Sequence, residues 1–280
     1  MKSCLVLEGG GLRGIYTAGV LDVFLDNNIS IDCIIGVSMG SLIGINYCSK
    51  QKGRAIRYNL KYCNDKRYIG LNSFLKTGNV ANKQFDYYDI PDKLDPFDYD
   101  EFKKSKVEFL CTVTNLETGK AEYIEINDCK KQVEYLRAGS SIPGLSKIVK
   151  IDDKKYLDGG IGDSIPVRKA IQLGYDKIIV VTTRDINYRK GNSKMKTLSR
   201  IYKKYPNFVK SIKSRNKRYN DTVDEVISLE KKGDIFVIRP SKRIKVRRIE
   251  KRRSVIKEQY DLGVLDTVNC LDKLNKYLKG

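Results

Sequence analysis

Residues 3–40 have the sequence SCLVLEGGGLRGIYTAGVLDVFLDNNISIDCIIGVSMG, and this stretch decides the fold. The apolar run 3–7 predicts a buried strand, and a glycine-rich turn and a helix over 15–27 follow it. A second apolar run predicts a strand over 32–35, followed by a second helix over 38–50. Strands that alternate with helices predict a parallel sheet covered by helices on both faces.

The rest of the chain continues this alternation. A strand pair around the turn Glu117-Thr118-Gly119 has the pattern of a hairpin. We therefore expect an α/β fold, a three-layer sandwich with a mostly parallel central sheet. The further strands are predicted at 107–114, 121–126, 147–151, 154–157, 177–182 and 235–238, and a further helix at 167–173.

Two segments have weaker patterns. Residues 65–105 contain Asp-Pro and tyrosine-rich stretches, which predict an irregular lid or connector. The basic segment 184–233 has helical periodicity that breaks at Pro206, and a second helix is predicted over 219–231.

The composition is typical of a globular protein, with 41% hydrophobic and 31% charged residues among 280. No apolar run approaches the roughly 20 residues that span a bilayer. The first ten residues predict a core strand rather than a signal peptide, so we expect a cytoplasmic location. The seven cysteines form no CxxC pair and lie mostly in apolar runs, which indicates buried, reduced thiols.

The chain contains no histidine. This excludes a Ser-His-Asp triad and a histidine-based metal site. The chain thus lacks the commonest general base and a common zinc ligand. Hydrolytic chemistry would have to use carboxylates, lysines or tyrosines.

The glycine cluster after the first strand contains Gly9, Gly10, Gly11 and Gly14. Glycines that open a helix expose backbone N–H groups, which bind a phosphate or a tetrahedral oxyanion. The same residues fit the dinucleotide pattern G-x-G-x-x-G, and a plain tight turn is a third interpretation. A dinucleotide site needs an acidic residue at the end of the second strand, whereas Asp32 lies at the start of that strand.

A second motif, Gly36-Val37-Ser38-Met39-Gly40, follows the second strand. It fits the nucleophile elbow G-x-S-x-G in its required context of strand, sharp turn and helix. In such an elbow the Ser38 hydroxyl projects from a helix N-terminus, and the N–H of Met39 donates to an oxyanion. The alternative is that Ser38 only caps the helix.

The third motif is Asp158-Gly159-Gly160, at the end of the predicted strand 154–157. Asp-Gly dipeptides usually mark turns. In a chain that has an elbow serine and no histidine, Asp158 is nevertheless the leading candidate for the general base.

Together and in this order, the three motifs resemble the patatin-like phospholipases, in particular their bacterial branch. The similarity extends over LVLEGGGLRGIYTAGVLDVF (5–24) and DGGIGDSIPVRKA (158–170), and also over Lys204-Tyr205-Pro206 and Ile238-Arg239-Pro240. The resemblance implies a patatin-like hydrolase fold, lipid degradation by acyl-ester hydrolysis, and a Ser38–Asp158 dyad without a cofactor or a metal. It implies an oxyanion hole formed by Gly9, Gly10, Gly11, Arg13, Gly14 and Met39.

Two positions need further comment. Arg13 would either add positive charge beside the oxyanion loop or fix the loop by pairing with a carboxylate. Met39 stands where the family often has a small residue, and it would either narrow the acyl pocket or pack under the elbow helix. The resemblance also suggests a catalytic core over 1–183 and a basic C-terminal extension over 184–280, packed on the core and containing the late strand 235–238.

Most of the net charge of +20 lies in residues 184–253, which hold 24 lysines and arginines against seven acidic residues. A solvated basic face is the simplest interpretation. The segment would alternatively contact anionic membranes peripherally, which would bring an acyl hydrolase to its lipid substrate. Nucleic-acid binding is the least favoured interpretation, although tyrosines accompany the cations.

Three functions therefore remain open from the sequence. A serine acyl hydrolase is favoured. A catalytically inactive patatin-like protein that binds lipid or nucleic acid is the alternative, and a nucleotide-dependent oxidoreductase is disfavoured by the position of Asp32.

Overall fold

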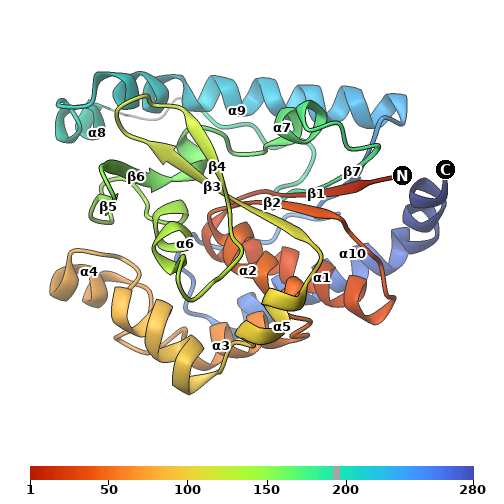
Figure 1. The fold of residues 1–280 in the computed structure, drawn as a ribbon, viewed down its shortest axis with the longest axis horizontal. Helices are drawn as coiled ribbons and strands as arrows, with labels where there is room; N and C mark the ends of the chain where they lie inside the picture. Colours follow the sequence, from red (N-terminus) through yellow and green to blue (C-terminus); the bar gives the residue numbers. More distant parts are fainter. Residues whose placement is uncertain (192–195) are drawn as a thin grey trace.

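The computed structural model describes residues 1–191 and 196–280. Its centre is an eight-stranded sheet with the strand order β5-β6-β3-β2-β1-β7-β8, and β4 pairs with β3 (Figure 1). The strands are β1 (Ser3–Leu7), β2 (Cys33–Val37), β3 (Glu108–Asn115), β4 (Ala121–Glu125), β5 (Val149–Ile151), β6 (Lys154–Asp158), β7 (Lys177–Val181) and β8 (Ile235–Ile238).

Most of this sheet is parallel. β1 pairs in parallel with β2 and β7, β2 pairs in parallel with β3, and β7 pairs in parallel with β8. The strands β4, β5 and β6 join by antiparallel pairing at one end of the sheet. The predicted α/β class with a mostly parallel central sheet is confirmed.

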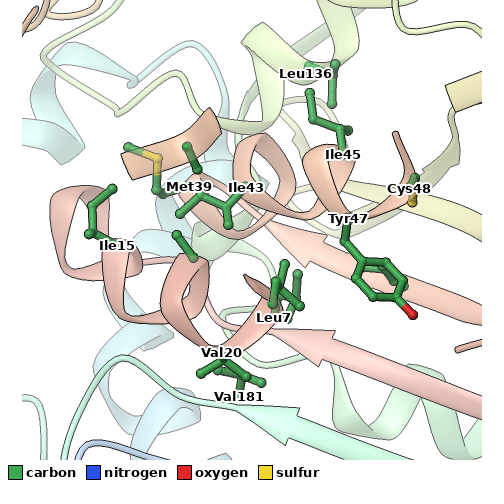
Figure 2. Close-up of a cluster of buried hydrophobic side chains, with 14 of the residues drawn as sticks. Leu7, Ile15, Val20, Met39, Ile43, Ile45, Tyr47, Cys48, Leu136 and Val181 are labelled. Atoms are coloured by element: carbon green, nitrogen blue, oxygen red, sulfur yellow. The ribbon is translucent and has the colours of Figure 1, made fainter. Parts of the chain in front are cut away.

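Helices cover both faces of the sheet, so the molecule has three layers (Figure 1). Side chains alternate along β1: Leu5 and Leu7 pack into the core beneath α1 (Ile15–Asp26), α2 (Met39–Cys48) and α10 (Arg253–Lys279). Cys4 and Val6 pack on the other face, against α7 (Val167–Gln172) and α9 (Pro206–Lys232). Figure 2 shows part of the larger core, in which Leu7, Val20 and Val181 join α1 to the sheet.

The prediction of an irregular segment over 65–105 is wrong. This segment contains α4 (Leu71–Thr77), the π-helix η2 (Phe85–Leu94) and α5 (Tyr99–Lys104), while α3 (Arg54–Tyr62) precedes it. The helices form because their apolar residues face the core: Phe85 and Ile90 are buried, and Asp98 caps α5 by accepting a hydrogen bond from the N–H of Glu101.

The helical pattern does break before Pro206, as predicted, but the second helix begins at Pro206, so the predicted start at 219 is wrong. α8 (Lys196–Ile201) is short, and α9 runs without a break from Pro206 to Lys232. Pro206 occupies the start of α9, where a missing N–H costs nothing, so the proline begins this helix. The predicted basic segment 184–253 includes residues 192–195, which lie outside the described residues. α6 (Val133–Gly139) completes the α-helices of the described chain, which also contains the short 3-10 helices η1 (Gly11–Gly14) and η3 (Gly159–Ile161).

Within the described ranges, no helix is both long and apolar enough to cross a membrane. All seven cysteines are free thiols, and six of them are buried, as the sequence predicts.

Candidate active site

Ser38 lies in a sharp turn between β2 and α2. Its backbone has φ 54° and ψ −122°, a conformation that a non-glycine residue rarely adopts. The neighbouring glycines allow the turn, because a Cβ on Gly36 would lie 2.7 Å from Ser41 Cα, and one on Gly40 would lie 2.7 Å from the carbonyl oxygen of Leu7. The motif thus has the geometry of an elbow, and Ser38 is not a hydrogen-bonding cap, since its side chain makes no capping bond.

The pairing of β3 brings Asp158 to this turn. The last residue of β2, Val37, lies opposite Thr112, and the last residue of β6, Asp158, lies opposite Val113. At both of these positions, β4 pairs with the opposite edge of β3. β2 and β6 therefore lie along the same edge of β3, and their last residues meet. A serine that follows β2 and an aspartate that ends β6 are therefore neighbours.

Ser38 and Asp158 are joined by a hydrogen bond. The Ser38 hydroxyl donates to Asp158 Oδ2 over 2.7 Å, and each residue is only 8% exposed. The other carboxylate oxygen, Oδ1, accepts the N–H of Gly160 over 2.8 Å. Gly159 packs directly against the carbonyl oxygen of Thr112, where a side chain would not fit. The Asp-Gly-Gly motif therefore fixes the carboxylate toward the serine.

The glycine-rich loop lies against the same serine. A Cβ on Gly9 would lie 2.9 Å from Ser38 Cβ, and one on Gly10 would lie 2.7 Å from Thr183 Oγ1. Gly11 has φ +59° and packs against Arg248. The carbonyl oxygen of Arg248 accepts a hydrogen bond from the N–H of Leu12. The backbone N–H groups of Gly10 and Gly11 donate no hydrogen bond to any described residue, and the same is true of Met39.

Glu8 anchors this loop, although it is not among the residues predicted from the sequence. Its buried carboxylate accepts hydrogen bonds from the N–H of Thr183 over 2.6 Å and from the hydroxyl of Tyr219 over 2.8 Å. An acidic residue at the end of an apolar strand was the available signal, because a buried carboxylate needs several donors.

Gly14 and Met39 form a close contact beside the elbow. A Cβ on Gly14 would lie 2.8 Å from Met39 Cγ, and Figure 2 shows Met39 between Ile15 and Ile43. Met39 also lines the cavity next to Ser38. Both interpretations of this residue, packing under the helix and narrowing the pocket, therefore agree with its position.

Arg13 forms no ion pair with a carboxylate in the described parts of the chain, so the interpretation that it pairs with one is wrong. Its Nε is buried without a hydrogen-bond partner among these residues. Burial, and next the positive charges of Arg184 and Arg248, lower the pKa of Arg13 to about 10.

Two cavities meet at Ser38. The first has mostly apolar walls, with Arg54 and Asp86 among its polar members. Its walls come from α2 and from the helices of the segment 54–99, so the segment predicted as a lid forms much of this cavity. The apolar and aromatic residues that line it include Met39, Leu42, Ile45, Tyr58, Tyr68, Ile69, Val80, Tyr87, Ile90, Phe97, Leu136 and Ile142.

The second cavity is basic, and Ser38, Asp158 and the glycine-rich loop line it. Five cationic side chains line it, and four of them belong to the basic segment 184–253. Sequence reasoning found the charge of this segment but not these positions, because the cations are far apart in the chain and only the fold brings them together. They are Arg13, Arg184, Lys190, Arg215 and Arg248.

No group of three or more Cys, Asp or Glu side chains in the described chain is placed to hold a metal ion.

Two family models match most of the chain. Residues 5–171 match the family model of the patatin-like phospholipases, and residues 205–279 match a domain of unknown function, DUF6363. The first match contains all three motifs of the site.

Curated relatives match about two thirds of the chain. The uncharacterized protein YjjU of Escherichia coli (strain K12) is 28% identical over 188 residues, which are 65% of this chain and 52% of YjjU. Lysophospholipase nte1 of Aspergillus niger is 29% identical over 194 residues, 65% of this chain and 12% of that protein. Lysophospholipase NTE1 of Scheffersomyces stipitis is 27% identical over 184 residues, 63% of this chain and 11% of that protein. The chain thus matches about half the length of the first relative and a small part of the other two, and by the match over 5–171 it belongs to the patatin-like phospholipase family.

Proposed function

We propose that the protein is a serine acyl hydrolase of lipid esters, a phospholipase A-like enzyme in which Ser38 is the nucleophile and Asp158 its proton acceptor. The observation that carries this proposal is the 2.7 Å hydrogen bond between the two side chains, in a buried elbow that opens into an apolar cavity. The membership of the patatin-like family and the relatives named lysophospholipases support the same activity.

In the first half of the reaction, Ser38 Oγ attacks the ester carbonyl carbon while Asp158 Oδ2 accepts its proton. The carbonyl oxygen becomes an oxyanion, for which the N–H groups of Gly10, Gly11 and Met39 are the proposed donors. When the tetrahedral intermediate collapses, the ester bond to the alcohol breaks. The proton on Asp158 passes to the leaving alkoxide, and the acyl group remains on Ser38 as an ester.

In the second half, Asp158 accepts a proton from a water molecule that attacks the acyl-enzyme. The second tetrahedral intermediate releases the carboxylic acid and returns the proton to Ser38 Oγ. The dyad ends in its starting state, and the cycle uses neither a metal nor a cofactor. The 2.8 Å hydrogen bond from Gly160 N–H to Oδ1 holds the carboxylate in position during both proton transfers.

The remaining proposals concern the context of this chemistry. Residues 1–183 would form the catalytic core and 184–280 a basic C-terminal extension, in line with the separate family matches over 5–171 and 205–279. The enzyme would act in the cytoplasm and contact anionic membranes peripherally through residues 184–253. The exposed cations of this segment, such as Arg247 and Lys251, support that contact.

Hydrolysis of a short-chain p-nitrophenyl ester by wild type, Ser38→Ala and Asp158→Asn tests the dyad. We expect both variants to lose nearly all turnover, while circular dichroism and thermal unfolding show that they remain folded. A fluorophosphonate probe should label wild type and not Ser38→Ala. Turnover by folded Ser38→Ala would contradict the proposal. A folded wild type that hydrolyses neither this ester nor any of a lysophospholipid panel would favour the alternative, an inactive protein that binds lipid.

A further inference from the structure

The basic cavity beside Ser38 is built from distant parts of the chain. Arg13 comes from the glycine loop, Arg184 and Lys190 follow β7, Arg215 lies on α9, and Arg248 precedes α10. Arg13, Lys190 and Arg215 are partly or largely withdrawn from solvent, and Arg248 reaches the cavity from the surface. Positive charges that converge in a concave, partly desolvated site attract an anion far more strongly than the same charges on an open surface.

These five cations lack carboxylate partners. Within residues 1–191 and 196–280, none of them forms an ion pair. Two carboxylates also line the cavity, and both already accept hydrogen bonds. Glu8 accepts them from Thr183 and Tyr219. Asp158 accepts them from Ser38 and Gly160. The cavity therefore has an excess of positive charge.

The cations also repel one another. Burial, and then the charges of Arg215, Arg248 and Arg13, lower the pKa of Lys190 to about 6, with Glu8 acting in the opposite direction. Lys190 Nζ lies 3.4 Å from the centroid of the Tyr219 ring. Its hydrogen-bond partner is Ser164 Oγ at 3.5 Å, a long and weak contact. A bound anion would relieve this repulsion and pair with the ammonium group.

The basic and apolar cavities share a boundary. Gly11, Ser38, Ile142 and Arg248 line both of them. An ester held at Ser38 can therefore extend its acyl chain into the apolar cavity and the rest of its alcohol into the basic one.

We propose that the basic cavity binds the phosphate of an anionic acyl-ester substrate, so that the enzyme selects lipids with a net negative headgroup over neutral and zwitterionic ones. This inference rests on the proposed acyl hydrolase function. Arginine suits the role because its planar guanidinium donates two parallel hydrogen bonds to a phosphate. A choline headgroup would place a cation beside the four arginines of this cavity, which disfavours zwitterionic substrates.

The test compares three soluble esters with the same acyl chain: monooctanoylglycerol phosphate, monooctanoylglycerophosphocholine and monooctanoylglycerol. The measured quantity is kcat/KM for the phosphate monoester divided by kcat/KM for the uncharged ester. We expect this ratio to exceed unity in wild type and to fall on the order of tenfold in Lys190→Met and in Arg184→Met, since each loses one charged contact to the phosphate. Lys213→Met is the matched control, because Lys213 is exposed on α9 and does not line the cavity.

A second arm measures binding of inorganic phosphate to folded Ser38→Ala by calorimetry. Phosphate should bind, should compete with the phosphate monoester in wild type, and should bind more weakly to the Lys190→Met form. Binding of phosphate without competition would identify a site for free phosphate and overturn the proposal. Equal kcat/KM for the charged and uncharged esters would also overturn it, while leaving the hydrolase function intact. Failure of every ester, with phosphate still bound, would instead refute the proposed function.

Discussion

The hydroxyl of Tyr219 donates a 2.8 Å hydrogen bond to the carboxylate of Glu8, across 211 positions of the sequence. Glu8 directly follows β1 and begins the glycine loop, whereas Tyr219 lies near the middle of α9. The bond therefore ties the loop beside Ser38 to the helix that carries Arg215 of the basic cavity.

Tyr219→Phe should lower the free energy of unfolding by roughly 1.5–3 kcal/mol, since it removes a hydrogen bond to a buried charged group and keeps the ring. Urea unfolding monitored by circular dichroism measures this change. Tyr188→Phe is the control: its ring packs edge-on against Tyr219, and its hydroxyl donates to no described residue. Equal, small effects of the two substitutions would show that the bond to Glu8 contributes little.

Gly9→Ala should reduce esterase activity while leaving the fold in place. The added Cβ would lie 2.9 Å from both Ser38 Cβ and the carbonyl oxygen of Val37, so the loop or the serine must shift. A displacement of about 1 Å in a reacting group costs on the order of 100-fold in rate. Steady-state kinetics and fluorophosphonate labelling measure the loss, and thermal unfolding checks the fold. Full activity of Gly9→Ala would mean that the loop is not held against the nucleophile.

Leu136→Phe should shift the preference of the enzyme toward shorter acyl chains. Leu136 is 3% exposed and lines the apolar cavity, and Figure 2 shows it facing Ile45 of α2. A larger side chain at this wall leaves less space in the cavity, which disfavours long acyl chains more than short ones. A series of p-nitrophenyl esters from acetate to palmitate measures kcat/KM against chain length. An unchanged profile would place the acyl chain elsewhere.

The parts of the site that the sequence predicts are those that local motifs encode. The elbow around Ser38 needs only a strand, two glycines and a helix, and these are contiguous. The prediction that Ser38 pairs with Asp158 rests on family resemblance and on the lack of histidine. The structural cause of their proximity is the register of the sheet, because β2 and β6 end opposite consecutive residues of β3. No pattern within either strand records that register.

The basic cavity could not be predicted for a related reason. Composition shows a charge excess over 184–253 but not which cations turn inward. Lys190 and Lys213 both lie in basic, polar stretches of the sequence. In the structure, Lys190 lies over the Tyr219 ring, whereas Lys213 is exposed. The prediction of an irregular segment over 65–105 is wrong because the Asp95-Pro96 pair suggests a turn, whereas burial of Phe85, Tyr87 and Ile90 stabilises a π-helix that even includes Pro91.

Glu250→Gln should destabilise the protein most above pH about 4.5, and the effect should become small as the pH falls through about 2. The Arg252 guanidinium, and next the backbone N–H groups of Arg252, Arg247 and Lys251, lower the pKa of Glu250 to about 2, while burial acts in the opposite direction. A carboxyl whose pKa is lower in the folded state stabilises the fold above its unfolded pKa and loses this contribution as the pH falls through the folded pKa.

The measurement is the difference in free energy of unfolding between wild type and Glu250→Gln from pH 2 to 7, with Glu258→Gln, at an exposed position of α10, as the control. The difference should be largest at pH 7 and should shrink across the range 4.5 to 2. A difference that does not vary with pH would show that the hydrogen bonds of Glu250 do not depend on its charge.

Sulfate should bind to the basic cavity more weakly as the pH rises above about 6, because Lys190 must be protonated to hold a dianion. Sulfate is chosen since it does not itself titrate in this range. The groups that face Lys190 are Glu8, Arg13, Arg215, Arg248 and the ring of Tyr219. A bound dianion raises the pKa of Lys190, so binding takes up a proton between the unliganded and liganded pKa values. By linkage, affinity then falls by up to about tenfold per pH unit in that interval. Calorimetry at pH 5.5 to 8 should show this slope in Ser38→Ala and in Ser38→Ala/Lys213→Met, and no slope in Ser38→Ala/Lys190→Met. The same slope in all three proteins would mean that another group takes up the proton and that Lys190 does not contact the anion.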